Sequence, residues 1–325
     1  MANLVAEYVK QVMNQDWLNF EQELFELPGS KVSAINEIYQ HMILARGKRI
    51  RASLVLLLSA ALGCQGENHI KLACIVEWLH AATLIHDDII DNAFERSNQL
   101  STHIKYGNTC AVLGGDYLYG IAFKKIAALS MPEITTCIAN ATVNIIEGEL
   151  LQMQVAQSHS VTMDLYLEII ASKTAKLFEV CSQVAVLNSC AISSDAAKFG
   201  YYFGMAYQML DDLQDYLADS EISGRKPGND YIEGKLTLPF IMALPKLTQA
   251  QQENIQNKKY SFAQVVEILR AADGFVLSRL EIMKQLDSSR GCLNKLDDNV
   301  YKEKLLEIVS FFENRCNLLA QIDQK

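Results

Sequence analysis

The stretch that decides the fold runs from Leu72 to Asp91 and reads LACIVEWLHAATLIHDDIID. Its apolar residues recur three and four positions apart, which is the pattern of one buried face of an α-helix. The run closes in an acidic turn made of Asp87, Asp88 and Asp91. A second apolar run closes in the same way with Asp211, Asp212 and Asp215. Two acidic turns of one design, each closing a long helix, suggest that the turns face each other.

The helical period extends through most of the remaining chain. It recurs in residues 54–62, 169–181 and 305–312, and no stretch alternates apolar and polar residues as a half-buried strand does. Only five prolines interrupt the 325 residues, which leaves room for long helices. No shift in composition marks a domain boundary. We therefore expect residues 1–325 to form a single all-α domain of roughly ten to twelve helices.

Charge and cysteine usage disfavour several classes of protein. Asp and Glu total 38 against 29 Lys and Arg, a net charge of −9, which argues against nucleic-acid binding through bulk charge. The longest apolar run, residues 52–63, is too short for a transmembrane segment. The acidic residues within Met1–Glu26 do not fit a signal peptide. Because the eight cysteines form no CxxC pair, we expect reduced thiols in a soluble, cytoplasmic protein.

The acidic turns carry residues suited to a divalent metal. Positions i and i+4 share one face of a helix, so Asp87 and Asp91 point the same way, as do Asp211 and Asp215. Crowded carboxylates repel one another unless cations offset their charge, and such hard oxygen ligands suit Mg²⁺ together with substrate phosphates. A solvated acidic helix end is the alternative, which the presence of two such turns disfavours.

Basic residues precede, separate and follow the two acidic turns. Lys48 and Arg51 lie three positions apart at the expected start of an apolar helix, where the helix N-terminus and two cations together favour an anion. An ordinary basic helix start is the alternative. Further along the chain stand Lys173, Lys176, Lys226 and Lys235. This arrangement indicates a diphosphate held by metal on one side and by Lys and Arg on the other.

Seven motifs in order resemble those of the trans-isoprenyl diphosphate synthases, and most of all the bacterial polyprenyl branch with medium- and long-chain (hexa-, hepta- and octaprenyl-like) products. They are GKRIR at 47–51, HAATLIHDDIID at 80–91, GGDYLYGIAF at 114–123, EGELLQ at 147–152, SKTAKLFE at 172–179, GMAYQMLDDLQDY at 204–216 and GRKPGNDYIEGKLTLP at 224–239. The resemblance implies an isoprenoid-synthase-like bundle around a central cavity. It also implies a prenyltransferase that condenses an allylic diphosphate with isopentenyl diphosphate, head-to-tail and in the trans configuration.

The resemblance assigns a role to each matching residue. Two Mg²⁺ would be held by Asp87, Asp88 and Asp91, and a third by Asp211, Asp212 and Asp215, with Mn²⁺ able to substitute. The allylic diphosphate would be bound by Arg96, Lys173, Thr174, Gln208, Lys226 and Lys235. Isopentenyl diphosphate would be bound by Lys48, Arg51 and His80, although His80 taken alone reads as a core histidine. Catalysis would rest on Lys173 and on aspartates 87, 88, 91, 211 and 212.

The family mechanism fits these residue types. Mg²⁺ and lysines neutralise the charge that develops on the departing diphosphate, so the allylic C–O bond ionises without an enzyme nucleophile. The double bond of isopentenyl diphosphate captures the carbocation, and by family likeness the released diphosphate takes the proton. Water must be excluded, which explains an apolar cavity and a closing Gly/Pro loop. The family habit is a homodimer, and pairing with a small accessory subunit is the alternative.

The chain departs from the family pattern in three places. Ser97 follows Arg96 where a second arginine is usual, Arg46 replaces a glycine, and Ala52 replaces a proline. By family position the missing arginine would contact isopentenyl diphosphate. The loss of one charge-assisted contact typically costs about 1.5–3 kcal/mol. We therefore predict a raised Michaelis constant for isopentenyl diphosphate, unless Arg46 substitutes.

Product length is a matter of the residues one helical turn before the first acidic turn. These residues are Ala82 and Thr83. By family likeness, small residues at these positions leave the product tunnel open. The alternative is that they serve only to pack this helix against its neighbours. We expect a product of more than four isoprene units. Trp78 lies four residues before Ala82 and could form a deeper floor, so Trp78→Ala should lengthen the product.

Four alternative interpretations of the sequence stay open at this point. A farnesyl- or geranylgeranyl-length synthase differs only in the tunnel. A catalytic chain that is inactive without a small partner would carry the same motifs. A terpene cyclase also ionises a prenyl diphosphate, but it has no need of a second diphosphate pocket. A regulatory subunit would usually lack the aspartates that this chain retains.

Overall fold

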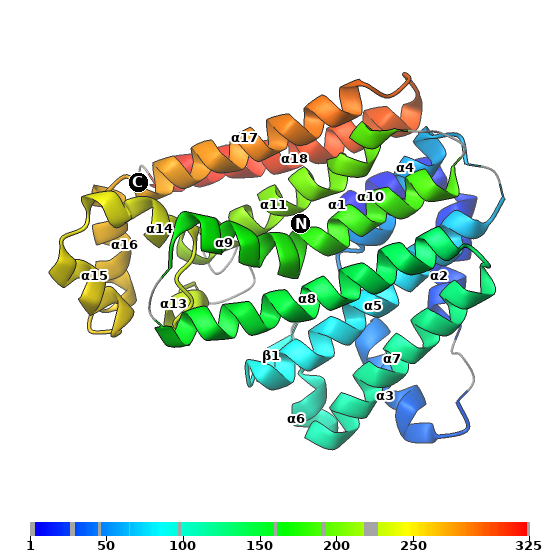
Figure 1. Cartoon of the computed structure of the whole chain (residues 1–325), viewed down its shortest axis with the longest axis horizontal. Coiled ribbons are helices and arrows are strands. Elements are labelled where there is room, and N and C mark those ends of the chain that lie inside the picture. The colour runs from blue at the N-terminus through cyan, green and yellow to red at the C-terminus, as the bar shows by residue number, and fades with distance from the viewer. Residues whose placement is uncertain are drawn as a thin grey trace. The chain divides into compact units, whose positions relative to one another are not determined.

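The computed structural model describes residues 4–26, 30–44, 47–64, 66–96, 99–158, 161–189, 193–217 and 227–323. These residues are almost entirely helical (Figure 1), so the expected all-α fold class is confirmed. The structure also contains a pair of strands that the sequence did not predict. Strands β1 (Glu95–Arg96) and β2 (Gln99–Leu100) form a small antiparallel hairpin in which Glu95 pairs with Leu100 and Arg96 with Gln99. Strands of two residues are too short to produce an alternating pattern in the sequence.

The chain clusters into two compact units, each assembled from segments that are far apart in sequence. Unit 1 comprises residues 1–139, 180–197 and 296–305, and unit 2 comprises residues 140–179, 198–295 and 306–325. Helices α8 (Pro132–Ser158), α10 (Lys176–Asn188), α11 (Ser194–Leu217) and α18 (Val300–Asp323) contribute to both units.

Unit 1 is built around two helices that are buried on nearly every side. Its elements are α1 (Leu4–Met13), α2 (Gln15–Phe25), α3 (Ser33–Leu44), α4 (Ile50–Ala61), α5 (Asn68–Ile90), the hairpin, α6 (Thr102–Tyr106) and α7 (Asn108–Ala128). Every residue from Ala52 to Ser59 of α4 and from Leu72 to Leu79 of α5 is buried. Helices without a polar face belong in a core, and here α5 packs against α4, α2 and α7.

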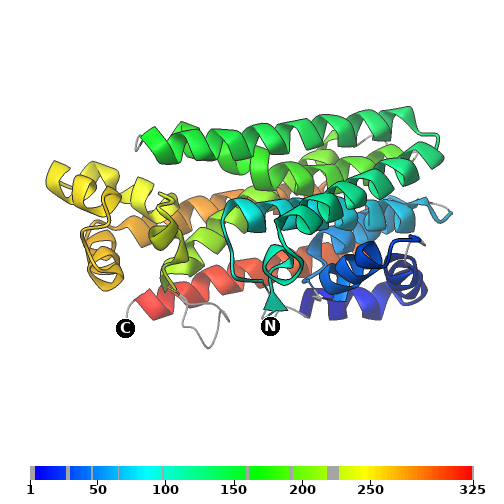
Figure 2. The ribbon, with the colours of Figure 1, turned by 90° about the horizontal axis from the view of Figure 1, so that it is seen from below.

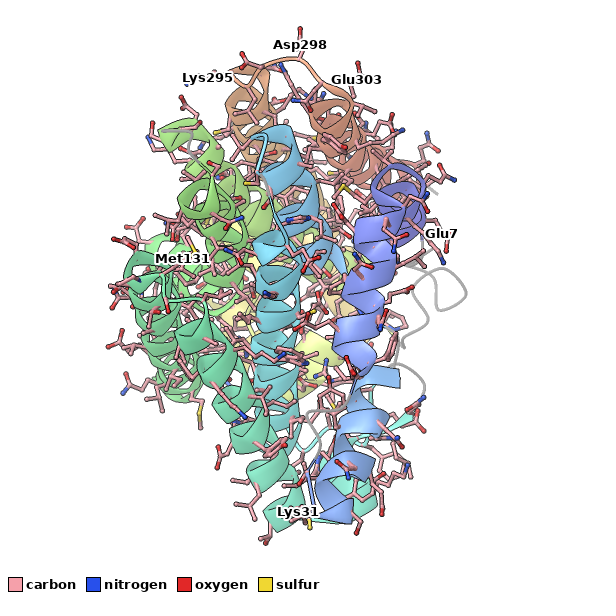
Figure 3. All side chains as sticks on the ribbon, turned by 90° about the vertical axis from the view of Figure 1, so that its right-hand side faces the viewer. Glu7, Lys31, Met131, Lys295, Asp298 and Glu303 are labelled. Carbon is pink, nitrogen blue, oxygen red and sulfur yellow. The ribbon has the colours of Figure 1, made fainter. Side chains whose placement is uncertain are left out.

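A short C-terminal segment closes one end of unit 1. Asn299 Nδ2 donates to the carbonyl of Ala61 at 3.0 Å, and Lys304 Nζ lies 5.8 Å from the ring centre of Tyr8. Figure 3 shows Asp298 and Glu303 at this end and Lys31 at the opposite end of the unit. The side chain of Asp298 is 97% exposed.

Unit 2 contains α9 (Met163–Ile170), a π-helical turn η1 (Ala171–Ala175), α13 (Asn229–Glu233), α14 (Leu238–Ala243), a 3₁₀ turn η2 (Leu244–Lys246), α15 (Gln249–Gln256), α16 (Phe262–Ala271) and α17 (Gly274–Asn294). Helices α17 and α18 run side by side, joined by Arg290 and Glu313 at 2.7 Å (Figure 1). Figure 2 shows α13 to α16 gathered in yellow and orange near the start of α17.

Aromatic rings form the centre of unit 2. Phe178, Phe203 and Phe312 stack edge-on, with ring centres 5.6 Å and 5.1 Å apart in turn. Phe199 and Tyr207 extend this cluster. The cluster fixes the long helix α11 against α10 and α18 within the unit, and α11 ends in the second acidic turn.

No helix in the described ranges combines the length and the apolar character needed to cross a membrane.

Candidate active site

The first acidic turn is the last turn of α5. The amide of Asp91 donates to the carbonyl of Asp87 at 2.8 Å, so the helical geometry continues through the motif. Asp87 and Asp91 are half-buried, whereas Asp88 is only 1% exposed. Adjacent residues on a helix point about 100° apart. The turn therefore presents two different environments, one open to ligands and one internal.

The carboxylate of Asp88 is hydrogen-bonded to Arg96, a residue of the hairpin. Its Oδ1 accepts hydrogen bonds from Arg96 Nε at 2.7 Å and from Arg96 Nη2 at 2.6 Å. Such charge-assisted contacts hold a guanidinium in a defined orientation. Arg96, expected to bind the allylic diphosphate, is thus fixed beside the acidic turn by the second aspartate of the motif. Ser97 lies outside the described residues.

Helix α7 packs closely against His86, the residue that precedes the acidic turn, because α7 carries a glycine at the contact. A Cβ at Gly115 would lie 2.3 Å from His86 Nε2, and a Cβ at Gly114 would lie 2.8 Å from a methyl carbon of Ile38. His86 Nε2 also lies 3.2 Å from the carbonyl of Val112. Burial, together with the charges of Asp87 and Asp116, raises the pKa of Tyr119 on this helix to about 12.

The residues of the basic motif at 47–51 lie in different environments: Arg49 makes structural contacts, whereas Lys48 is exposed. Arg49 is the N-cap residue of α4 and adopts a left-handed backbone conformation, with φ of 50°. Its Nη1 donates to Oε2 of Glu77 at 2.8 Å, while Glu77 Oε1 accepts from the amide of Ala52 at 3.2 Å. Glu77, 4% exposed, therefore caps the N-terminus of α4 from the middle of α5. Lys48 remains exposed.

Arg51 and His80 are brought together. Arg51 Nη1 lies 3.0 Å from His80 Nε2. Burial lowers the pKa of His80 well below 6.5, and the charges of Arg51, Arg96 and Arg49 lower it further. His80 is therefore neutral, and its Nε2 accepts the hydrogen bond from Arg51. The imidazole orients the guanidinium rather than adding a positive charge.

The residues expected to control product length lie in the body of α5. Ala82 is buried, and the hydroxyl of Thr83 donates to the carbonyl of His80 at 2.8 Å. Trp78 is buried and its Nε1 donates to the hydroxyl of Tyr39 at 2.8 Å, which in turn donates to the carbonyl of Leu24. Trp78 is thus fixed by hydrogen bonding to α3.

The second acidic turn lies at the end of α11 and has the same division of roles. Asp211 is exposed, whereas Asp212 is 3% exposed and accepts from Tyr166 at 2.7 Å and from Gln208 Nε2 at 2.7 Å. Burial raises the pKa of Asp212 to about 6. Gln208 in turn accepts from the hydroxyl of Thr174 at 2.8 Å. Gln208 and Thr174, both expected to bind diphosphate, are linked to each other here.

Asp215 is hydrogen-bonded to the backbone of a segment that follows α11 in sequence. Its carboxylate accepts from the amides of Asn229 at 3.2 Å and Asp230 at 3.0 Å, and so caps the short helix α13. Burial and the charges of Asp212 and Asp215 raise the pKa of Asp230 well above its usual value. Lys235 forms an ion pair with Glu233 at 2.7 Å. Lys226 lies outside the described residues.

Lys173 lies on the π-helical turn and points to α8. Its ammonium lies 2.5 Å from Glu149 Oε2 and donates to Gln152 Oε1 at 2.8 Å. Glycines from both neighbouring helices accommodate the wider turn. A Cβ at Gly148 of α8 would lie 2.6 Å from Ser172 Cβ, and one at Gly204 of α11 would lie 2.7 Å from Ala175 Cα. π turns of this kind are common at functional sites.

The arrangement of the acidic side chains bears on how a metal ion would be held. Within the part of the chain that the structure describes, no three His, Cys, Asp or Glu side chains converge on a common point. The carboxylates still fit hard cations that take further ligands from water and from substrate phosphates. Exposed Asp211 and half-buried Asp87 and Asp91 meet that description better than Asp88 and Asp212, whose oxygens serve internal partners.

Several site residues escaped the reading of the sequence. Glu77 could have been found as the one charged residue inside the apolar stretch from Leu72 to Leu79. Tyr166 carries no sequence signal of its own, since it acts through a tertiary contact to the second acidic turn. Glu149 and Asp230 each lie in a motif shared with the family, but no role was predicted for either of them.

Comparisons with known proteins identify the family of this chain. The model of the Polyprenyl synthetase family matches residues 32–272. The octaprenyl diphosphate synthase of Escherichia coli K12 is 31% identical over 309 residues, which cover 92% of this chain and 96% of that protein. Component 2 of the heptaprenyl diphosphate synthase of Bacillus subtilis 168 is 29% identical over 310 residues, 93% and 89% of the two chains.

A solved structure also matches. The polyprenyl synthase of Caulobacter crescentus CB15, complexed with calcium and isoprenyl diphosphate, has a TM-score of 0.89 and 27% identity, and the match covers 96% of this chain and 98% of that one. The relatives are named as polyprenyl diphosphate synthases, and the chain is accordingly a prenyltransferase with their all-α fold. The chain belongs to the polyprenyl synthetase family, which confirms the resemblance inferred from its motifs.

Proposed function

We propose that this protein condenses an allylic diphosphate with isopentenyl diphosphate, head-to-tail and in the trans configuration. The observation that carries the proposal is the shared design of the two acidic turns. In each turn the second aspartate is buried and hydrogen-bonded, and the first is more open to ligands. The relatives named as octaprenyl and heptaprenyl diphosphate synthases support the same chemistry.

Mg²⁺ would be held by Asp87 and Asp91 on the first turn and by Asp211 on the second, and it would supply neutralisation of the charge on the departing diphosphate. The calcium in the Caulobacter polyprenyl synthase supports a divalent cation. Three Mg²⁺ per site, with Mn²⁺ as a substitute, follow from the family resemblance alone. In this chain Asp88 and Asp212 hold neighbouring side chains in place.

Side chains that would bind the allylic diphosphate already interact with carboxylate or amide side chains of this chain. Lys173 lies between Glu149 and Gln152, and Arg96 lies against Asp88. Diphosphate offers stronger acceptors than a single carboxylate, so Lys173 would exchange partners when the substrate binds. Thr174, Gln208, Lys226 and Lys235 complete the set expected from the motifs.

Isopentenyl diphosphate, the second substrate, would be bound by Lys48, Arg51 and His80. Because neutral His80 accepts from Arg51, its deletion should misorient the guanidinium without removing a charge. Ser97 still stands where a second arginine is expected. Ser97→Arg should lower the Michaelis constant for isopentenyl diphosphate, and an unchanged constant would refute that explanation.

We assign the product to the class longer than four isoprene units, because Ala82 and Thr83 are small. The shorter-chain alternative predicts a product that stops at farnesyl or geranylgeranyl diphosphate. Incubation of the purified chain with Mg²⁺, farnesyl diphosphate and labelled isopentenyl diphosphate, followed by chromatography of the products, tests both. Asp211→Asn serves as the inactive control. Cyclic hydrocarbons in place of a lengthened diphosphate would refute the proposal in favour of a cyclase.

The active assembly would be a homodimer in the cytoplasm. Helix α8 supports a self-association surface, since Val143, Ile146, Leu150 and Met153 are exposed at three- and four-residue intervals along it. Leu150→Glu should yield monomers in sedimentation velocity runs, whereas Leu280→Glu, at an equally exposed leucine on α17, should not. The Bacillus relative is named as one component of its synthase, so a chain inactive alone would favour an accessory subunit.

A further inference from the structure

One buried carboxylate of unit 1 is bonded to both the side chain and the backbone at the start of α4. Glu77 lies in the middle of α5, and its side chain is 4% exposed. Its Oε2 accepts from Arg49 Nη1 at 2.8 Å, and its Oε1 accepts from the amide of Ala52 at 3.2 Å. A buried carboxylate is costly unless it is paired with a charge and hydrogen-bonded, and both conditions are met here.

The start of α4 depends on these contacts because its own N-cap side chain makes no capping bond. A serine or aspartate at the N-cap would accept from the third amide of the helix, which here is the amide of Ala52, and Glu77 accepts from it instead. Arg49 has φ of 50°, a strained conformation for a residue with a side chain. Its Nη2 donates to the carbonyl of Ile43 at 2.8 Å, so the guanidinium joins α3 to α5.

The same face of α5 also contacts a side chain of the predicted isopentenyl diphosphate site. His80 lies three residues after Glu77, and residues at that spacing are neighbours on a helix surface. The Nε2 atom of His80 lies 3.0 Å from Arg51 Nη1. Through Arg49 and Ala52, Glu77 fixes the backbone on both sides of Arg51. His80 orients the guanidinium of Arg51 itself.

We infer that Glu77 is a positioning residue for the isopentenyl diphosphate site. It acts through Arg49 and the amide of Ala52. These two contacts fix the backbone from which Lys48 and Arg51 project. The inference rests on the proposed function, because it requires that Lys48 and Arg51 bind that substrate. Both carboxylate oxygens of Glu77 accept, so a glutamine in its place has one oxygen for two donors and cannot satisfy both.

Steady-state kinetics of the full-length protein with Mg²⁺, farnesyl diphosphate and isopentenyl diphosphate test this role. Glu77→Gln should raise the Michaelis constant for isopentenyl diphosphate about tenfold, through weakened charge-assisted contacts. The constant for farnesyl diphosphate and kcat should stay within about twofold, since ground-state binding of one substrate is affected. Glu313→Gln is the matched control, because Glu313 is also paired with an arginine, Arg290, at 2.7 Å but joins α17 to α18.

A second variant tests the same role without a change of charge. Arg49→Lys keeps the cation but loses the planar fork that reaches both Glu77 and Ile43, so it should raise the same Michaelis constant. In the double variant Glu77→Gln/Arg49→Lys, the increase should be well below the product of the two single increases, because the residues act through one contact. Fully multiplicative increases would contradict an action of Glu77 through Arg49.

The outcomes separate this inference from the proposed function. An active wild-type protein whose Glu77→Gln variant has unchanged constants, or equal increases for both substrates, would overturn the positioning role alone. Should Glu77→Gln fail to fold, Arg49→Lys decides in the same way. A wild-type protein that forms no lengthened diphosphate would overturn the proposed function. Calorimetric titration with isopentenyl diphosphate would then decide, with about tenfold weaker binding to Glu77→Gln as the expected result and equal or absent binding as the refutation.

Discussion

Replacement of Gly115 by alanine should destabilise the protein, because α7 contacts the acidic turn through that glycine. The new methyl group would lie 2.3, 2.7 and 2.9 Å from three ring atoms of His86. Overpacking of this kind costs about 1–3 kcal/mol. Displacement of the ring also removes its contact with the carbonyl of Val112, about 1 kcal/mol more, while alanine returns about 0.5–1 kcal/mol in helix propensity. The net loss is about 1–3 kcal/mol.

Urea denaturation followed by far-ultraviolet circular dichroism measures this loss as a lower midpoint. Gly120→Ala is the matched control on the same helix, because nothing lies within 4 Å of its Cβ position. That variant should gain about 0.5–1 kcal/mol. Since His86 is the group in the way, Gly115→Ala should cost little more when it is added to His86→Ala. A stable Gly115→Ala protein, or a double variant with purely additive losses, would refute the reasoning.

Three further predictions follow from other contacts. Lowering the pH from about 7.5 to about 5.5 should destabilise wild type more than His80→Gln in urea, because the unfolded histidine binds a proton near pH 6.5 while folded His80 does not. Tyr166→Phe should lower the urea midpoint by the equivalent of about 1.5–3 kcal/mol, since it strips buried Asp212 of a hydrogen bond; an unchanged midpoint would contradict that contact. Trp78→Ala should lengthen the product seen by chromatography while losing about 3–5 kcal/mol of stability, and an unaltered product distribution would argue against a floor at this position.

The sign of the pH prediction follows from proton binding. At His80 the unfolded chain carries up to one more proton than the folded chain below about pH 6.5. The contribution of this residue to stability therefore increases with pH through that range, at a slope of at most about 1.4 kcal/mol per pH unit. His80→Gln removes the titrating group and keeps an acceptor for Arg51. Equal pH dependence in the two proteins would show that His80 titrates normally.

Much of the helical framework could be predicted from apolar spacing alone. Helices α4, α5 and α11 have large buried faces, and a buried face imposes a period on the sequence. The positions of the acidic turns at the ends of α5 and α11 followed from the same spacing. The hairpin at Glu95–Leu100 could not be predicted, because it is too short to show a period.

Which aspartate of each motif is buried could not be predicted from sequence either. Asp87 and Asp88 are adjacent and chemically identical, and only the hairpin that brings Arg96 onto Asp88 distinguishes them. Asp211 and Asp212 differ in the same way through Tyr166. That the two turns face each other, and that each named residue binds substrate or metal, remain predictions.

The π-helical turn at Ala171–Ala175 makes this part of the chain sensitive to length as well as to composition. A turn closed by i→i+5 bonds holds one residue more than an α-turn. Deleting a single residue there would restore a regular helix and rotate everything downstream by about 100° relative to what precedes it. Lys173 could then keep Glu149, or Thr174 could keep Gln208, but not both. An engineer shuffling segments among such enzymes should therefore place no crossover between Ile170 and Lys176.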